Sequence, residues 1–261
     1  MNPRCAEFCN NAHVILRPHT DVSKFFTSGA AKQALWRSTG GHQFVASTLK
    51  PARGDLRVHL LRESLQPQFA AYPGAPTRVR GYPPFAGQHA LIIEVAPGLM
   101  IERVIDLALK TDPVLEPGIL FVEPQFGILE IHGSDQARIQ QTGQAVLAGL
   151  GLDAGDQLAA RILYTDVIED LADQHAVIIN RNRQASMVLP GETLLIVEMV
   201  PALYAAIAAN EAEKVAPGLT LVDVQMIGAA GRLYMAGSSA DVRQGLGKIE
   251  RVLAAINGRA G

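Results

Sequence analysis

The chain has 261 residues, of which 48% are hydrophobic, 18% charged and 5% aromatic. This length and composition are typical of one or two globular domains with a sizeable core, and they exclude disorder along the whole chain. The two cysteines, Cys5 and Cys9, are too few and too close together for a disulfide framework. The net charge of -2 gives no indication of nucleic acid or an anionic membrane as a partner.

The chain contains no apolar run long enough to span a membrane, and its first residues lack the pattern of a secretory signal. These features predict a cytoplasmic protein. A chain with so few charged residues also has apolar surface to hide beyond its own core, so we expect it to self-associate.

Residues 1–56 differ in charge from the rest of the chain. They carry seven basic and three acidic residues, a net charge of +4, which leaves -6 for residues 57–261. Glycine and proline interrupt this segment, and its short apolar pieces show no sustained period. We interpret residues 1–56 as a flexible basic extension.

From about residue 57 onward the chain repeats itself. When it is shifted by 104 residues, Leu91–Pro97 aligns with Leu195–Pro201, and 13 of the 44 positions from Leu91 to Ser134 are identical. Arg57 falls on Arg161 in the same alignment. A long internal repeat indicates duplicated domains. We therefore predict two homologous domains, at residues 57–156 and 157–261.

The elements predicted in the first copy follow one another in a simple order. A strand at 91–95 leads into a helix that reaches about residue 110, with Pro97 in the first turn, where a helix tolerates proline. Two short strands at 119–122 and 128–131 follow, around a loop that ends in Gly127. A second amphipathic helix closes the unit, with Ile139, Val146 and Leu150 on its buried face.

The second copy repeats this order, with strands at 194–199, 219–224 and 232–235 and a closing helix. Each copy is therefore predicted to be a small α+β domain, with an antiparallel sheet flanked by helices.

The motifs of common enzymes are missing from the sequence. It contains neither a His-Glu-x-x-His metal motif nor a Gly-x-Ser-x-Gly nucleophile motif, and its seven histidines lack the spacing of metal ligands. Cys5, Cys9, His13 and His19 gather possible zinc ligands, but their spacing matches no strong metal pattern. We therefore predict no catalytic residues, no metal and no cofactor.

Four stretches in the two copies carry a family resemblance: Ser64–Tyr72, Asp106–Lys110, His175–Arg181 and Ala208–Lys214. Together they resemble the tandem-domain shell proteins of bacterial microcompartments, in particular the carboxysome type with an N-terminal extension and two circularly permuted domains. The resemblance covers residues 57–256.

This resemblance implies a homotrimer whose six domains form a pseudohexagonal tile in the compartment shell. Such tiles contact other shell proteins laterally, stack as a dimer of trimers, and carry a central pore for metabolites larger than bicarbonate. The charge of the basic extension suits contact with an acidic enzyme cargo or a neighbouring tile, and the alternative is a flexible tail without a partner. Two alternatives remain open: a tile of a catabolic microcompartment that processes ethanolamine or propanediol, and a trimeric regulatory protein that binds a small ligand.

In this family the loop between the two short strands lines the pore. The matching residues in the two copies are Glu123, Pro124, Gln125, Phe126 and Gly127, and Gly228, Ala229 and Ala230. The second loop is small and neutral, whereas three copies of the first would form a ring of carboxylates. Such a ring repels phosphorylated anions.

Gated members of the family carry a glutamate followed by an arginine in this loop. Glu123 matches the glutamate, but Pro124 stands where the arginine would be. Proline has no charge and a fixed φ, so it can neither neutralise the carboxylates nor swing aside. Any gating would then come from Gln125, Phe126 or a rearranged loop. The competing interpretations are that Glu123 is only a solvated carboxylate and that Phe126 packs as core beneath the loop.

Overall fold

The computed structural model describes residues 54–75 and 81–261. These residues belong to one compact unit, Arg53–Gly261. The predicted extension at 1–56 lies almost wholly outside the described residues, as do Cys5, Cys9, His13 and His19. Within the described residues, no helix is long and apolar enough to cross a membrane.

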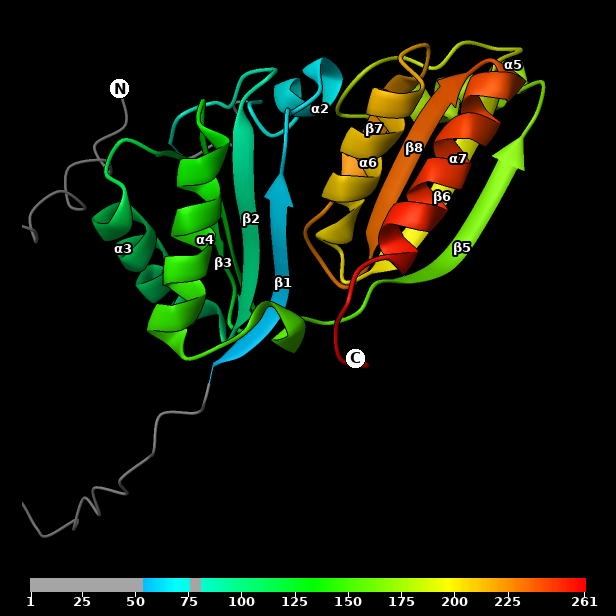
Figure 1. The fold of residues 1–261 in the computed structure, drawn as a ribbon. Helices are drawn as coiled ribbons and strands as arrows, with labels where there is room; N and C mark the ends of the chain where they lie inside the picture. Colours follow the sequence, from blue (N-terminus) through cyan, green and yellow to red (C-terminus); the bar gives the residue numbers. More distant parts are fainter. Residues whose placement is uncertain (1–53, 76–80) are drawn as a thin grey trace, which may run out of the picture. The chain divides into compact units, whose positions relative to one another are not determined.

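Two antiparallel four-stranded sheets of the same topology form the framework of this unit (Figure 1). Their strand orders are β1-β2-β4-β3 and β5-β6-β8-β7. The predicted pair of small α+β domains with antiparallel sheets is therefore confirmed. The strands are β1 (Asp55–Arg62), β2 (His89–Ala96), β3 (Glu116–Val122), β4 (Gly127–Gly133), β5 (Arg161–Ile168), β6 (Thr193–Val200), β7 (Thr220–Gln225) and β8 (Gly231–Gly237).

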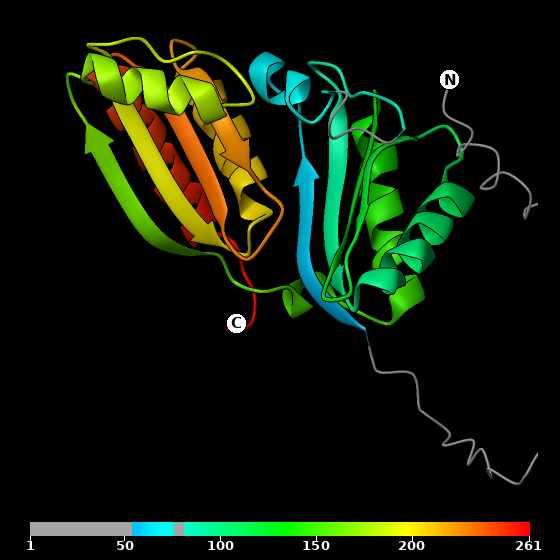
Figure 2. The same ribbon diagram turned by 180° about the vertical axis from the view of Figure 1, so that it is seen from behind.

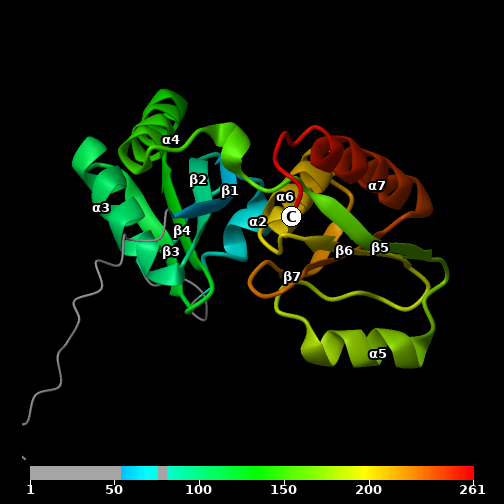
Figure 3. The ribbon, with the colours of Figure 1, turned by 90° about the horizontal axis from the view of Figure 1, so that it is seen from below.

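Each sheet carries two long helices on one face, α3 and α4 on the first and α6 and α7 on the second (Figures 1 and 2). A further helix, α5, lies on the opposite face of the second sheet (Figure 3). The helices are α2 (Pro67–Ala71), α3 (Ile101–Thr111), α4 (Gln136–Leu150), α5 (Asp173–Asn182), α6 (Tyr204–Val215) and α7 (Ser239–Ala254), with single 3-10 turns at Gly98–Met100 and Ala154–Asp156.

Strand β2 is mostly apolar, apart from His89 and Glu94, because both of its faces are covered. Leu91, Ile93 and Val95 pack in one core cluster with residues of α3 and α4. Ala90 and Ile92 point to the other face and belong to a second cluster. A strand that is buried on both sides loses the alternation of polar and apolar residues.

That second cluster joins the two repeats. It combines Val58, Ile92 and Ile128 of the first sheet with residues of α6, among them Tyr204 and Ala209. Helix α6 is consequently buried on nearly every side, whereas its counterpart α3 is buried along one face only. The repeats of one chain therefore share an extensive core.

Two details of the predicted repeat need correction. Pro97 and Pro201 precede the helices, which begin at Ile101 and Tyr204, so neither proline lies in an α-helical first turn. A short turn after each proline separates the strand from its helix.

The repeat alignment is also displaced in the first strand of each domain. Asp55 pairs with Ala96, and Arg161 pairs with Val200. The structural offset there is 106 residues, and Arg57 is therefore not the counterpart of Arg161. The segment between the first two strands is two residues shorter in the second repeat, which accounts for the difference.

Candidate pore loops and their surroundings

The hairpin between β3 and β4 presents the predicted pore residues of the first repeat. The backbone N–H of Glu123 donates to the carbonyl of Phe126 over 2.9 Å and closes a tight turn. The N–H of Gly98 donates to the carbonyl of Pro124 over 3.4 Å. Glu123, Pro124 and Gln125 are exposed at the tip. The hairpin thus offers one carboxylate and one amide from a tip with a well-defined backbone.

Two glycines let this hairpin rest directly on the turn that follows Pro97. A Cβ at Gly98 would overlap the carbonyl oxygen of Glu123, and a Cβ at Gly127 would overlap the carbonyl oxygen of Gly98. Only glycine permits so close an approach of two backbone segments. The Glu123 tip is therefore positioned by the backbone beneath it.

Phe126 packs as core. Its side chain is 6% exposed, and its ring centroid lies 5.9 Å from that of Phe121. The guanidinium carbon of Arg57 lies 6.0 Å from the same ring centroid. Burial of this apolar ring removes it from the surface of the hairpin. The structure therefore supports the interpretation that Phe126 packs as core beneath the loop.

Arg57 lies beside the base of the hairpin, but it is already paired. Its guanidinium donates to the carboxylate of Glu94, which is 3% exposed. Burial raises the pKa of Glu94, and the bond from Arg57 opposes that rise. Within the described part of one chain, no ion pair involves Glu123.

The hairpin between β7 and β8 is the counterpart in the second repeat. Phe121 pairs with Ile128 in the first hairpin, and Gln225 pairs with Arg232, 104 residues later on both strands, in the second. Glu123 therefore corresponds to Ile227, which is half-buried. In the second loop Ala229 is exposed, Gly228 and Ala230 are half-buried, and Gly228 has a φ of 136°, a conformation that favours glycine.

A buried acid–histidine pair, which the sequence analysis did not single out, lies on β4. His132 is fully buried, and its Nδ1 atom is 2.9 Å from Oε1 of Glu130. Burial raises the pKa of Glu130, and the contact with His132 lowers it in part. The signal was weak because these residues alternate with apolar ones along an ordinary strand.

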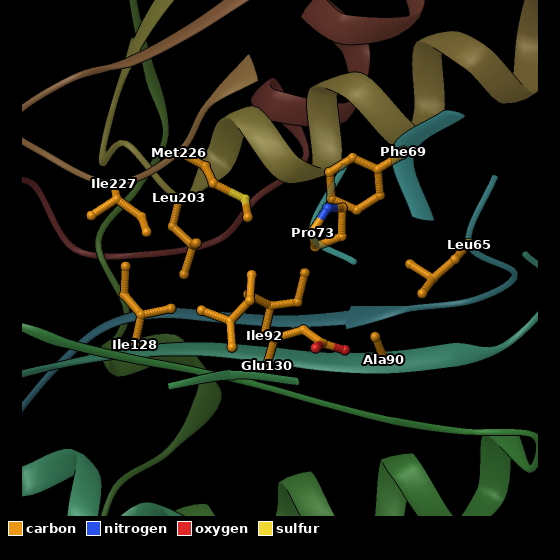
Figure 4. A pocket seen from close by; sticks show the side chains of 11 residues that line it. Leu65, Phe69, Pro73, Ala90, Ile92, Ile128, Glu130, Leu203, Met226 and Ile227 are labelled. Atoms are coloured by element: carbon orange, nitrogen blue, oxygen red, sulfur yellow. The ribbon is translucent and has the colours of Figure 1, made fainter. Parts of the chain in front are cut away.

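Glu130 also lines a small cavity of about 10 Å³, which is close to the space that one water molecule needs. Figure 4 shows the side chains around it: one group comes from the first sheet and from α2 with the residues on either side of it, and Leu203, Met226 and Ile227 come from the second repeat. Among the residues that the structure describes, no cluster of three or more histidine, cysteine or acidic side chains could hold a metal ion.

The chain holds two like domains, each with a hairpin that presents its tip in the same register. Comparison with known proteins identifies it as a tandem-domain shell protein of the bacterial microcompartment class. Residues 56–156 match the family model of the CsoS1D N-terminal domain. The chain is 41% identical over 160 residues to the carboxysome shell protein CcmP of Synechococcus elongatus, covering 61% of this chain and 74% of that protein. It is 40% identical over 161 residues to the carboxysome shell protein CsoS1D of Hydrogenovibrio crunogenus, covering 61% and 77%.

A solved structure adds a relative over a longer stretch. The double-ringed trimeric shell protein MSM0271 from the RMM microcompartment is 60% identical, with a TM-score of 0.77, covering 80% of this chain and all of that one. The chain therefore belongs to the tandem-domain, carboxysome-type shell proteins that include CcmP and CsoS1D. It is a structural protein of a microcompartment shell.

Proposed function

We propose that three copies of the chain close into a pseudohexagonal tile with a pore on its threefold axis. The observation that carries this proposal is the near-equivalence of the two repeats, which share sheet topology, hairpin register and helix placement. Threefold closure of a chain with two like domains imitates sixfold symmetry. The double-ringed trimeric relative supports the same assembly.

The pore would be lined by the exposed hairpin tips, alternating around the axis. Glu123, Pro124 and Gln125 form the tip of the first repeat, and Gly228, Ala229 and Ala230 form that of the second. Phe126 and Gly127 support the first tip from below because both are buried. Small residues leave room for a solute beside the tip, and the carboxylate sets the charge that the solute meets.

The role proposed for this tile is structural and not catalytic. It would contact other shell proteins along its edges and allow metabolites larger than bicarbonate through its pore. A second trimer would stack on the first, as the double-ringed relative indicates for its own assembly. A contact between the basic extension and an enzyme cargo stays a prediction, since that segment lies outside the described residues.

Native mass spectrometry and electron microscopy together test the proposed tile. The purified chain, of 27.9 kDa, is expected to have the mass of three copies, or of six where two trimers stack. Negative-stain images should show six-cornered plates with a central depression. A monomer at micromolar concentration would contradict the proposal, and so would a threefold particle whose hairpin tips lie at its outer edge.

The sequence identities to the relatives also point to a second candidate compartment, the RMM microcompartment. The relatives CcmP and CsoS1D are carboxysome proteins at about 40% identity, whereas the relative from the RMM microcompartment is 60% identical. The higher identity to the RMM protein is the observation that makes a second kind of compartment a candidate beside the carboxysome. Isolation of the intact compartment from the host and mass spectrometry of its cargo decides between them: enzymes of carbon dioxide fixation would indicate a carboxysome, and other enzymes the second candidate.

A further inference from the structure

The interface between the two repeats of one chain is a template for the interface between chains. On the first sheet, the face opposite α3 and α4 is covered by α6, and Val58, Leu60 and Ile92 on that face are at most 3% exposed. The second sheet has the same face, but no third repeat within the chain can cover it.

The counterparts of these interface residues are correspondingly exposed. Tyr164 pairs with Glu198 as Val58 pairs with Glu94, yet Tyr164 is 53% exposed whereas Val58 is fully buried. The other half of the template is exposed as well. Leu99 is 75% exposed although its counterpart Leu203 is fully buried. One chain therefore leaves one half of this interface open on each repeat, and a second copy can complete it.

The cavity in Figure 4 shows what the template brings together. Leu203, Met226 and Ile227 of the second repeat cover Ile92, Ile128 and Glu130 of the first sheet. The matching cavity of the second sheet is lined by Ile196, Asp223 and Tyr234 and is much larger, about 260 Å³. Among the described residues that line it, the cover comes from α5 and Arg183, which follows α5. The counterparts of Leu203, Met226 and Ile227 in the first repeat are Leu99, Val122 and Glu123. In a second copy of the chain, these are the residues that approach this face.

At one position, an apolar contact between the two repeats of one chain corresponds to a pair of opposite charges between two chains. Ile227 and Ile128 lie on facing sides of the cavity in Figure 4. Their counterparts are Glu123 and Arg232. Arg232 is half-exposed on β8 and donates through Nε to Glu198 over 3.0 Å, which leaves guanidinium N–H groups available for a second carboxylate.

We propose that Arg232 pairs with Glu123 of a second copy of this chain. Arg232 then supplies the positive charge that the hairpin itself lacks, because position 124 is a proline. The inference rests on the proposed trimer. Three such pairs surround the axis and neutralise the ring of Glu123 carboxylates. An exposed ion pair is weak and screened by salt, so Glu123 can leave Arg232 and expose its charge to the pore without any movement of Pro124.

Disulfide trapping tests the contact directly. In a chain with Cys5→Ser and Cys9→Ser, the double variant Glu123→Cys with Arg232→Cys is oxidised and run on a non-reducing gel. Covalently linked dimers and trimers are expected. The matched control pairs Glu123→Cys with Arg251→Cys, an exposed arginine on α7, and should stay uncrosslinked.

The result separates this inference from the proposed function. A chain that has the native mass of a trimer but gives no more linked product with Arg232→Cys than with Arg251→Cys overturns the contact and leaves the tile intact. A chain that is monomeric before oxidation overturns both.

Charge exchange gives an independent readout of the same contact. Glu123→Arg or Arg232→Glu alone places like charges together, and each should weaken trimer association by about threefold to tenfold at low salt. The double exchange should recover most of that loss. Because Arg232→Glu also removes the bond to Glu198, the variant Glu198→Gln is measured as the control. Losses that simply add in the double variant would contradict the pair.

Discussion

Replacing glycine by alanine is expected to have opposite effects on the free energy of unfolding at two positions of this chain. A Cβ at Gly127 would overlap the carbonyl of Gly98 and crowd Ile101, whereas a Cβ at Gly247 on α7 meets no atom within 4 Å. Gly127→Ala is expected to destabilise the protein by about 1–3 kcal/mol through overpacking. Gly247→Ala should stabilise it by about 0.5–1 kcal/mol through helix propensity.

Urea unfolding of both variants at one protein concentration checks these signs. Equal effects of the two substitutions would show that the hairpin does not depend on the close backbone approach.

The buried carboxyl of Glu130 predicts a pH dependence. Its pKa is raised from 4.5 because burial disfavours the charged form. A carboxyl with a higher pKa in the folded state binds more protons there, so its stabilisation is complete below the unfolded pKa and is lost as pH rises through the folded pKa. Glu130→Gln removes this loss. The melting temperature of Glu130→Gln relative to the natural chain should therefore increase as pH is raised from about 4.5 to 8.

Gln140→Ala on the exposed side of α4 removes no titratable group, so it is the control for this series and should run parallel to the natural chain across the same pH range. A Glu130→Gln curve that also runs parallel would refute the effect.

At the scale of elements, α2 is stabilised by a carboxylate from α6. The five-residue helix α2 has no side-chain cap of its own, and Glu213 accepts the N–H groups of Gln68 and Phe69 over 2.9 and 3.0 Å. An anionic acceptor suits a helix N-terminus. The counterpart of Glu213 in the first repeat is Leu109. The substitution Glu213→Leu leaves both N–H groups without an acceptor and should lower the free energy of unfolding by about 2–4 kcal/mol.

The unfolding free energy at fixed protein concentration measures this cost. Glu213→Gln should lose less than Glu213→Leu because it keeps one acceptor oxygen, and Glu250→Gln on the exposed face of α7 should lose almost nothing. A loss for Glu213→Leu no larger than that for Glu250→Gln would contradict the capping role.

The long elements could be predicted because an apolar period marks α3 and the repeat places the corresponding helix α6 104 residues later. The short ones could not. Helix α2 has too few residues for a period, and β5 has a mixed pattern because its face is uncovered within one chain. The helix after Pro97 was predicted to begin too early, since the short turn between Pro97 and Ile101 has no periodic pattern.

The candidate site was only partly predictable for a similar reason. The exposure of Glu123 follows from its place in a tight hairpin turn, which is local. The burial of Phe126 depends on Phe121 and Arg57, which tertiary packing brings to it. The pair Glu130–His132 depends on what covers β4, and nothing in the strand itself reports that cover.

At the scale of the whole molecule, the chain should depend on Leu99 for assembly and not for folding. The residue is 75% exposed in one chain, and its counterpart Leu203 is fully buried between the repeats. In a closed trimer Leu99 would be buried against the next copy, so Leu99→Glu places an unpaired carboxylate there at about 3 kcal/mol per interface, more than a hundredfold in affinity. Light scattering should then show the 27.9 kDa monomer with unchanged circular dichroism.

Ala148→Glu, on the exposed side of α4, is the matched control for Leu99→Glu because it adds the same charge away from the template interface. It should leave the trimer intact. Dissociation by both variants would indicate that added negative charge alone separates the copies, and a trimer that survives Leu99→Glu would mean that the contact between repeats is not reproduced between chains. Because the two repeats share one architecture, the interface that closes the tile is expected to be the same one that joins them within the chain.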